Sequence, residues 1–156
     1  MKTIAFCLLL TLVAQTLCRA EITRLPADTR KALQDTSRFQ QIVKVAALPS
    51  GIVALCTYSN KMADPGKEWN VGDMDPNFKL PSRCLIWAAT DKDYYVVHYE
   101  SGGIAPRHHL LIARLKPGDK SFTLIWHGVG GSLKDLNAAL NAIDNNQLND
   151  DPRIRR

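Results

Sequence analysis

The chain has 156 residues with a formal net charge of +5, and 46% of its residues are hydrophobic. A chain of this length is expected to form one domain with its own core. The excess positive charge is concentrated at the two ends, and no basic stripe interleaved with aromatic residues lies between them, which argues against nucleic-acid binding.

Residues 1–20 are typical of a secretory signal peptide. Lys2 precedes an apolar run from Ile4 to Val13 that is too short to cross a bilayer. Cys18 and Ala20 are small residues at the two positions that signal peptidase reads, so cleavage is expected directly after Ala20. We therefore expect an exported protein, periplasmic or secreted, whose mature form contains no membrane span.

One or two short helices are expected before the sheet. Leu25-Pro26-Ala27-Asp28 has the form of a helix N-terminus, and the following "TRKALQD" has good helix propensity. Residues 49–58 allow either of two structures. Pro49-Ser50 can begin a second helix that directs Val53 and Cys56 inward, whereas the β-branched residues of this stretch also suit a strand. We favour the helix.

A long connection follows, from Ser59 to Arg83, and glycines and prolines interrupt it repeatedly. Connections of this length within a compact domain are usually functional or internally packed. Its larger apolar residues either pack onto the domain or contact a partner. These predicted partner-binding residues are Met62, Trp69, Met74 and Phe78.

Cys56 and Cys84 bracket this connection and are the two cysteines outside the signal peptide. Two cysteines in an exported chain usually pair, so we expect a Cys56–Cys84 disulfide that stabilises the fold by roughly 3 kcal/mol. The alternative is two free, buried thiols.

In the second half of the chain, apolar and polar residues alternate with the two-residue period of β-strands. Four runs have strand composition and are joined by short turns, which predicts a four-stranded antiparallel meander. The runs are "CLIWAA", "YYVVHYE", "RHHLLIARL" and "SFTLIWH". A helix with Leu133, Leu136, Leu140 and Ile143 on one side should pack on this sheet. We predict one α+β domain over residues 21–143 and a polar, disordered tail over residues 144–156.

The turn "SGGIAP" suggests a register for the central hairpin. If Glu100 pairs with Arg107, then His98 faces His109, and a matching register with the last strand adds His127 to the same row. The deduction is conditional, because a slip of one residue moves the side chains of each strand to the opposite face.

This row of histidines allows three interpretations. His98, His109 and His127 could bind zinc with a water as the fourth ligand. His98 and Glu100 could act as a catalytic acid–base pair, because imidazole titrates near neutral pH. The third interpretation, which we favour, is a structural sheet face with a Glu100–Arg107 pair. We therefore expect no cofactor.

The phrases "MADPG", "LPSRCLIWAA", "VHYESGGI" and "LKDLNAAL" resemble a group of small exported proteins from Gram-negative bacteria. The resemblance spans roughly residues 48–140. It implies a periplasmic or secreted α+β domain. The group has no assigned function, so the resemblance transfers no catalytic residues.

Two functions follow from these observations. The first is a non-catalytic binding protein, of the inhibitor or immunity type, whose partner is another envelope or secreted protein. The alternative is a small hydrolase or zinc-dependent enzyme that uses His98, Glu100, His109 and His127. Small size, export and the absence of a recognisable catalytic motif favour the first.

Overall fold

The computed structural model describes residues 25–57, 61–72, 79–115 and 121–151. Its helices are α2 (Ala27–Leu33), α3 (Ser50–Cys56) and α4 (Leu136–Asp144), with two short 3-10 helices, η1 (Thr36–Arg38) and η2 (Val45–Ala47). Its strands are β1 (Gln40–Ile42), β2 (Arg83–Thr90), β3 (Tyr94–Ser101), β4 (Arg107–Arg114), β5 (Thr123–Gly130) and β6 (Asn149–Asp150).

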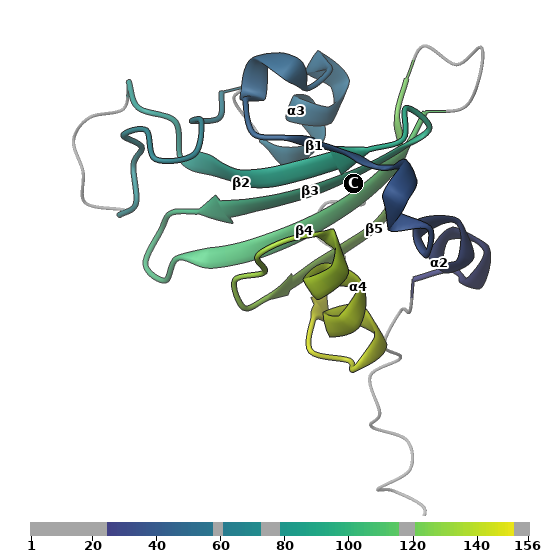
Figure 1. The fold of residues 1–156 in the computed structure, drawn as a ribbon. Coiled ribbons are helices and arrows are strands. Elements are labelled where there is room, and N and C mark those ends of the chain that lie inside the picture. Colours follow the sequence, from purple (N-terminus) through teal and green to yellow (C-terminus); the bar gives the residue numbers. More distant parts are fainter. Residues whose placement is uncertain (1–24, 58–60, 73–78, 116–120, 152–156) are drawn as a thin grey trace, which may run out of the picture.

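The strands form one antiparallel sheet in the order β1-β2-β3-β4-β5-β6, so each strand pairs with its neighbours in sequence. Helix α3 lies on one face of this sheet, and α2 and α4 lie on the other (Figure 1). The predicted α+β class, the antiparallel meander and the C-terminal helix are confirmed. The sheet has six strands instead of four, because β1 and β6 are too short to show an alternating pattern.

The two faces of the sheet bury separate hydrophobic cores. The face under α2 and α4 packs Val96, Leu110 and Ile112 against Leu33 and Ala139. The face under α3 buries a second cluster that contains Ile52, Leu85, Val97, Tyr99 and Leu111. A sheet that is covered on both faces has strands that are apolar almost throughout, as the central strands here are.

The helix at residues 50–56 resolves the ambiguity of that stretch. Pro49 precedes the first turn, and Ile52, Val53 and Cys56 are buried against the sheet. The sequence interpretation that turned Val53 and Cys56 inward on a helix is confirmed.

The predicted disordered tail is wrong for residues 145–151. Leu148 is 7% exposed and packs in the core beneath α4. Asn149 and Asp150 then pair with Val129 and Gly128 at the edge of the sheet. Leu148, a single apolar residue among polar neighbours, is only a weak sequence signal for this docking. Residues 152–156 and the predicted signal peptide lie outside the described residues.

Within the described ranges, no helix combines the length and hydrophobicity needed to cross a membrane.

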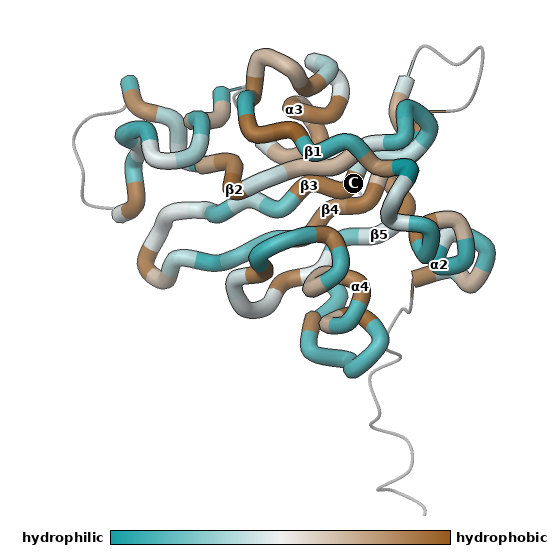
Figure 2. Tube along the Cα trace, in the orientation of Figure 1, coloured by the Kyte–Doolittle hydropathy of each residue, from teal (hydrophilic) through white to brown (hydrophobic). Residues whose placement is uncertain are grey.

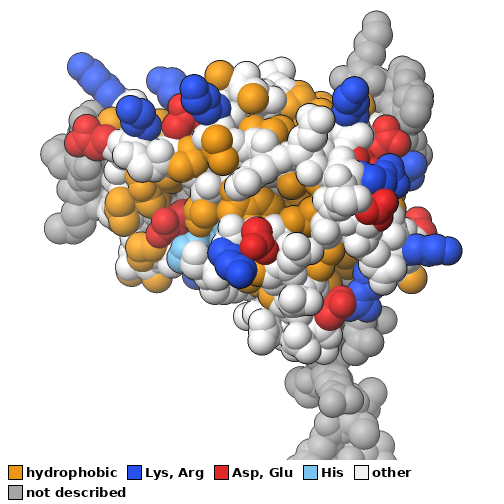
Figure 3. All heavy atoms as spheres, in the orientation of Figure 1, with side chains coloured by type: hydrophobic (Ala, Val, Ile, Leu, Met, Phe, Trp, Pro, Cys, Tyr) orange, Lys and Arg blue, Asp and Glu red, His pale blue; other side chains and the backbone are white. Residues whose placement is uncertain are grey.

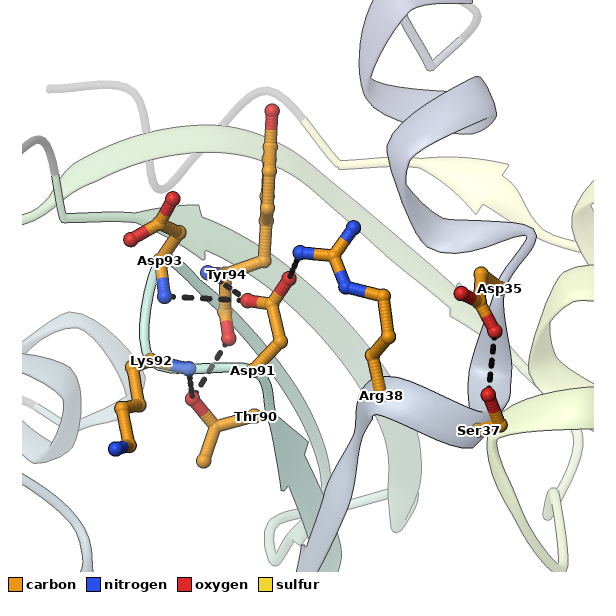
Figure 4. A network of polar contacts seen from close by, with 8 residues as sticks. All are labelled: Asp35, Ser37, Arg38, Thr90, Asp91, Lys92, Asp93 and Tyr94. Atoms are coloured by element: carbon orange, nitrogen blue, oxygen red, sulfur yellow. Dashed lines mark hydrogen bonds and ion pairs between the residues drawn. The ribbon is translucent and has the colours of Figure 1, made fainter.

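The turn between β2 and β3 is built around the carboxylate of Asp91 (Figure 4). Asp91 accepts hydrogen bonds from the backbone N–H groups of Asp93, at 3.1 Å, and Tyr94, at 2.7 Å. It also accepts one from the guanidinium of Arg38 at 3.0 Å. This network connects the N-terminal segment to the sheet and fixes the tight turn in which Lys92 adopts a positive φ of 80°.

We expect Asp91→Ala to lower the free energy of unfolding by about 1–3 kcal/mol, because two backbone N–H groups lose their acceptor. Urea unfolding monitored by circular dichroism measures the change. The matched control is Asp35→Ala, which removes a carboxylate bonded to the exposed Ser37 and should change stability by less than about 0.5 kcal/mol. Equal losses in the two variants would contradict this account.

Candidate functional site

The register of the β3–β4 hairpin differs by one residue from the predicted one. Tyr99 pairs with His109 and Ser101 pairs with Arg107, so the predicted pairings of His98 with His109 and of Glu100 with Arg107 are wrong. The Ser101 hydroxyl lies 2.8 Å from His109 Nε2, and the Tyr99 ring lies parallel to the His109 ring at 4.8 Å. These contacts favour the observed register, which places Ser101 in the strand instead of the turn.

The shift separates the three histidines that the sequence placed in one row. His98 lies on the face covered by α4, across from Leu110, whereas His109 and His127 lie on the α3 face. The alternative interpretation of a zinc site formed by His98, His109 and His127 therefore fails at His98, which lies on the opposite face.

His98 holds the segment before α4 onto the sheet. The Leu133 N–H donates to His98 Nε2 at 3.0 Å, and His98 Nδ1 bonds the carbonyl of His109 at 2.9 Å. Trp87 Nε1 donates to the carbonyl of the same Leu133 at 2.7 Å. The backbone N–H and carbonyl of Leu133 are thus bonded to two side chains of the sheet.

These contacts also fix the protonation of His98. A ring nitrogen that accepts from a backbone N–H carries no proton, so Nδ1 is the donor and the ring is neutral. Burial lowers the pKa of His98 to about 4, although its hydrogen bond to the His109 carbonyl acts in the opposite direction. Both ring nitrogens serve backbone groups, so the geometry does not support His98 and Glu100 as an acid–base pair. Glu100 itself pairs with His108 in the ladder.

A buried polar cluster lies on the α3 face of the sheet, toward the edge that β6 forms. We call it the histidine cluster, and its members are Tyr99, Ser101, His109, His127 and Asp151. His109 Nδ1 and His127 Nε2 are 3.1 Å apart, and His127 Nδ1 lies 3.3 Å from the carbonyl oxygen of Asp151. The N–H of Asp151 returns a bond to the His127 carbonyl at 2.9 Å.

The acceptor at one end gives this chain of hydrogen bonds a direction. The Asp151 carbonyl can only accept, so His127 Nδ1 donates, and Nε2 of the neutral His127 ring then accepts from His109 Nδ1. His109 Nε2 then accepts from the Ser101 hydroxyl. Both rings are neutral in this arrangement. Burial lowers the pKa of His109 to about 3.

The order Ser101, His109, His127 matches the nucleophile, base and orienting group of a serine hydrolase, but the surroundings do not suit that chemistry. A general base works best with a pKa near the working pH, and that of His109 is far below neutrality. The N–H groups of Gly102 and Gly103 donate to the carbonyls of Ser82 and Val71, so neither is available to stabilise an oxyanion. Since Ser101 is also buried, the geometry supports a structural or metal-binding role better than catalysis.

His109, His127 and Asp151 each offer one potential metal-ligand atom, and these atoms lie within 4.8 Å of one another. Two of the predicted ligands therefore remain together, and Asp151 occupies the third place. Sequence reasoning missed Asp151 because it assigned residues 144–156 to a disordered tail. The signal that could have found it is Leu148, whose burial brings the following residues to the sheet edge.

The long connection divides between core and surface. Met62 is 8% exposed and packs in the cluster beneath α3, so its predicted role as a partner contact is wrong. Trp69 is half-buried. Met74 and Phe78 lie outside the described residues.

Cys56 and Cys84 are both buried and free, and no disulfide is seen within the described residues. Burial raises the pKa of both thiols, so they stay protonated and weakly reactive. The open alternative of two buried thiols is the arrangement that the structure has. Pairing in an exported, oxidised form of the protein stays a prediction.

A second candidate site lies at the tip of the β3–β4 hairpin. Ile104 is 95% exposed and Val71 is 46% exposed, and the Gly103 N–H donates to the Val71 carbonyl at 3.0 Å. The two apolar side chains thus flank one backbone hydrogen bond. We call Val71, Gly102, Gly103 and Ile104 the hairpin ledge.

The hairpin ledge is held by backbone contacts. The Gly102 N–H donates to the Ser82 carbonyl at 3.1 Å, and the Asn70 N–H donates to the Pro81 carbonyl at 2.9 Å. A Cβ at Gly102 would lie 2.3 Å from the backbone oxygen of Asn70, so only glycine allows this approach. Figure 2 shows a hydrophobic stretch at the turn between β3 and β4, and Figure 3 shows hydrophobic atoms on the surface at that end of the molecule.

No protein-family model, curated protein or solved structure matches this chain. The resemblance to small exported proteins of Gram-negative bacteria therefore stays an expectation from the sequence phrases, and no relative contributes site residues.

We expect His98→Phe to destabilise the protein, because the ring keeps its volume while the Leu133 N–H and the His109 carbonyl both lose a partner. Each buried group left without a partner costs about 1–3 kcal/mol. Urea unfolding measures the loss, and hydrogen exchange at the Leu133 amide should accelerate. The control is His108→Phe on the same face, whose ring is half-buried and stacks on His98 at 5.8 Å. An unchanged hydrogen-exchange rate at the Leu133 amide in His98→Phe would contradict the role of His98 in holding this segment.

Proposed function

We propose that this protein is a non-catalytic binding protein of the cell envelope or secreted fraction that docks on another exported protein through the hairpin ledge. The observation that carries the proposal is the juxtaposition of Ile104 and Val71, two large apolar side chains exposed on either side of the Gly103–Val71 backbone hydrogen bond. Single exposed apolar residues are ordinary on protein surfaces, whereas adjacent ones on a fixed backbone suit a partner pocket.

Preorganisation supports this role. Binding is weakened by the entropy of ordering flexible loops, and a loop that is already ordered avoids that cost. The ledge is tied to Ser82 and Val71 by backbone bonds and closed by the tight approach of Gly102 to Asn70. These contacts therefore hold the described conformation of the ledge without a partner.

The charge beside the ledge indicates what kind of partner fits. Arg83, Ser101 and Arg107 form a row across three strands directly below the hairpin tip. Arg107 is exposed. A partner with an apolar pocket and an acidic rim would complement this end of the molecule, and the basic residues would mainly increase the rate of association.

We expect Ile104→Asp to abolish capture of the partner while leaving the fold intact. The test immobilises the protein, captures its partner from envelope extract of the native host and identifies it by mass spectrometry. Calorimetry with the purified partner should then show at least about a tenfold increase in Kd for Ile104→Asp. Because Ile104 is almost fully exposed, its substitution should change the free energy of unfolding by less than about 0.5 kcal/mol.

The matched control is Val43→Asp. Val43 is 52% exposed, as apolar as Val71, and follows β1, the strand at the other end of the chain of strand pairings from β6. Capture should survive this change. If Ile104→Asp and Val71→Asp both keep the Kd of the unmodified protein, the hairpin ledge is not the interface.

A second variant tests the shape of the ledge separately from its apolar side chains. Gly102→Ala keeps Ile104 and Val71, but its Cβ would displace the hairpin tip from the Asn70 backbone. We expect weaker partner binding together with a lower melting temperature, measured by differential scanning fluorimetry. Unchanged binding would show that the fixed spacing of the two segments does not matter.

A further inference from the structure

We propose that His109, His127 and Asp151 bind one divalent transition-metal ion of the zinc class, which attaches the C-terminal segment to the sheet. This inference concerns the histidine cluster and does not depend on the hairpin ledge. It replaces the row of three histidines that the sequence suggested with two histidines and a carboxylate that the fold brings together from β4, β5 and the end of β6.

The separations suit a small tetrahedral ion. Two nitrogens that bind one zinc at its usual bond length lie about 3.4 Å apart. His109 Nδ1 and His127 Nε2 are 3.1 Å apart, so a small rotation of either ring admits the ion between them. Asp151 offers a carboxylate oxygen within 4.8 Å of a ring nitrogen of each histidine. The Tyr99 hydroxyl, 3.5 Å from His127 Nε2, stands near the fourth position, where it or a water would complete the site.

The outer ring nitrogens have the partners that metal-bound histidines require. A ligating histidine almost always donates its other N–H to a carbonyl, carboxylate or water, which fixes the orientation of the ring. His127 Nδ1 faces the Asp151 carbonyl, and His109 Nε2 faces the Ser101 hydroxyl. Each histidine therefore presents its remaining nitrogen to the other, at the place where the metal would lie.

Metal binding requires one change of tautomer, which the cluster can accommodate. His109 Nδ1 must give up its proton to bind the ion, and the neutral ring can carry that proton on Nε2 instead. The Ser101 hydroxyl then accepts from Nε2, because a hydroxyl is both donor and acceptor. The proton moves from one ring nitrogen to the other, the His109–His127 hydrogen bond is replaced by two bonds to the metal, and the hydrogen bonds to Ser101 and to the Asp151 carbonyl are kept.

The ligand types select the metal class. Two imidazoles and one carboxylate suit zinc and its neighbours in the transition series, whereas magnesium and calcium prefer all-oxygen sites. The three residues are buried, as in a structural metal site. The ion would add a cross-link to a segment that the sheet holds through the two-residue strand β6 and the Asp151 N–H.

The experiment uses the full chain, purified without a histidine tag, stripped with a chelator and then given one to two equivalents of Zn²⁺. After desalting, mass spectrometry of the metal content should find one zinc per chain, and the melting temperature should rise relative to the metal-free protein. Co²⁺ should give the visible absorption of a four-coordinate site. A protein that retains no zinc and shows no thermal shift would overturn the proposal.

Three variants separate the cluster from adventitious binding. Asp151→Ala removes the carboxylate ligand but keeps the backbone N–H and carbonyl that bond His127, and should abolish retention of zinc. Ser101→Ala leaves all ligands and should weaken zinc binding by about 10–100-fold through the loss of its support for His109. His108→Ala on the opposite face should bind zinc like the unmodified protein. Equal zinc binding in Asp151→Ala and in His108→Ala would place the ion elsewhere and overturn the assignment.

Discussion

The pairing of Tyr99 with His109 is the constraint on which the rest of this structure depends. Side chains alternate between the faces of a sheet, so a slip of one residue between β3 and β4 would move the entire side-chain set of one strand relative to the other. In the observed register the apolar residues of both strands divide between two cores. A parallel Tyr99–His109 contact and the Ser101–His109 bond add to the same pairing.

This register also determines on which face of the sheet each histidine is buried and which groups it bonds. Imidazole buried as a cation would be costly, and burial without hydrogen bonds would be costly as well. The structure avoids both penalties because backbone groups orient the rings: the Leu133 N–H and the His109 carbonyl hold His98, and the Asp151 carbonyl begins the chain through His127. Three buried histidines can therefore remain neutral, and each connects a peripheral segment to the sheet or to another strand.

Much of the fold could be predicted from the sequence, and the parts that could not have a common physical cause. The four central strands, the helix at residues 50–56 and the C-terminal helix each show a local period or turn signal. The register depends on contacts between residues such as Ser101 and His109, which no local pattern displays. β6 and Asp151 were missed because a two-residue strand has no period, and docking of that segment depends on the single apolar residue Leu148.

The site residues follow the same division. His109 and His127 were recognisable as a pair because both stand on predicted strands, and their association survived the error in register. The sequence could not show that His98 lies on the opposite face, because its face depends on the register of the β3–β4 hairpin. Met62 was indistinguishable from an interface residue until the fold showed that it is buried in the cluster beneath α3.

The histidine cluster and the hairpin ledge meet at one point in the chain, where Ser101 is followed by Gly102. Ser101 directs its hydroxyl to His109, whereas the next two residues direct their N–H groups to Ser82 and Val71. The ledge is therefore held by backbone bonds to the long connection, and the cluster by side-chain bonds to β4, β5 and the C-terminal segment.

Two sites are coupled when they share a structural element with two conformations and when binding at each site favours one of those conformations. The described strands have a single conformation. The backbone contacts of the ledge do not involve His109 or His127, so they are the same with or without a metal ion between these histidines. A metal ion at the cluster would thus act on stability and on the attachment of the C-terminal segment, and docking at the ledge would depend on it only through the fraction of folded chain.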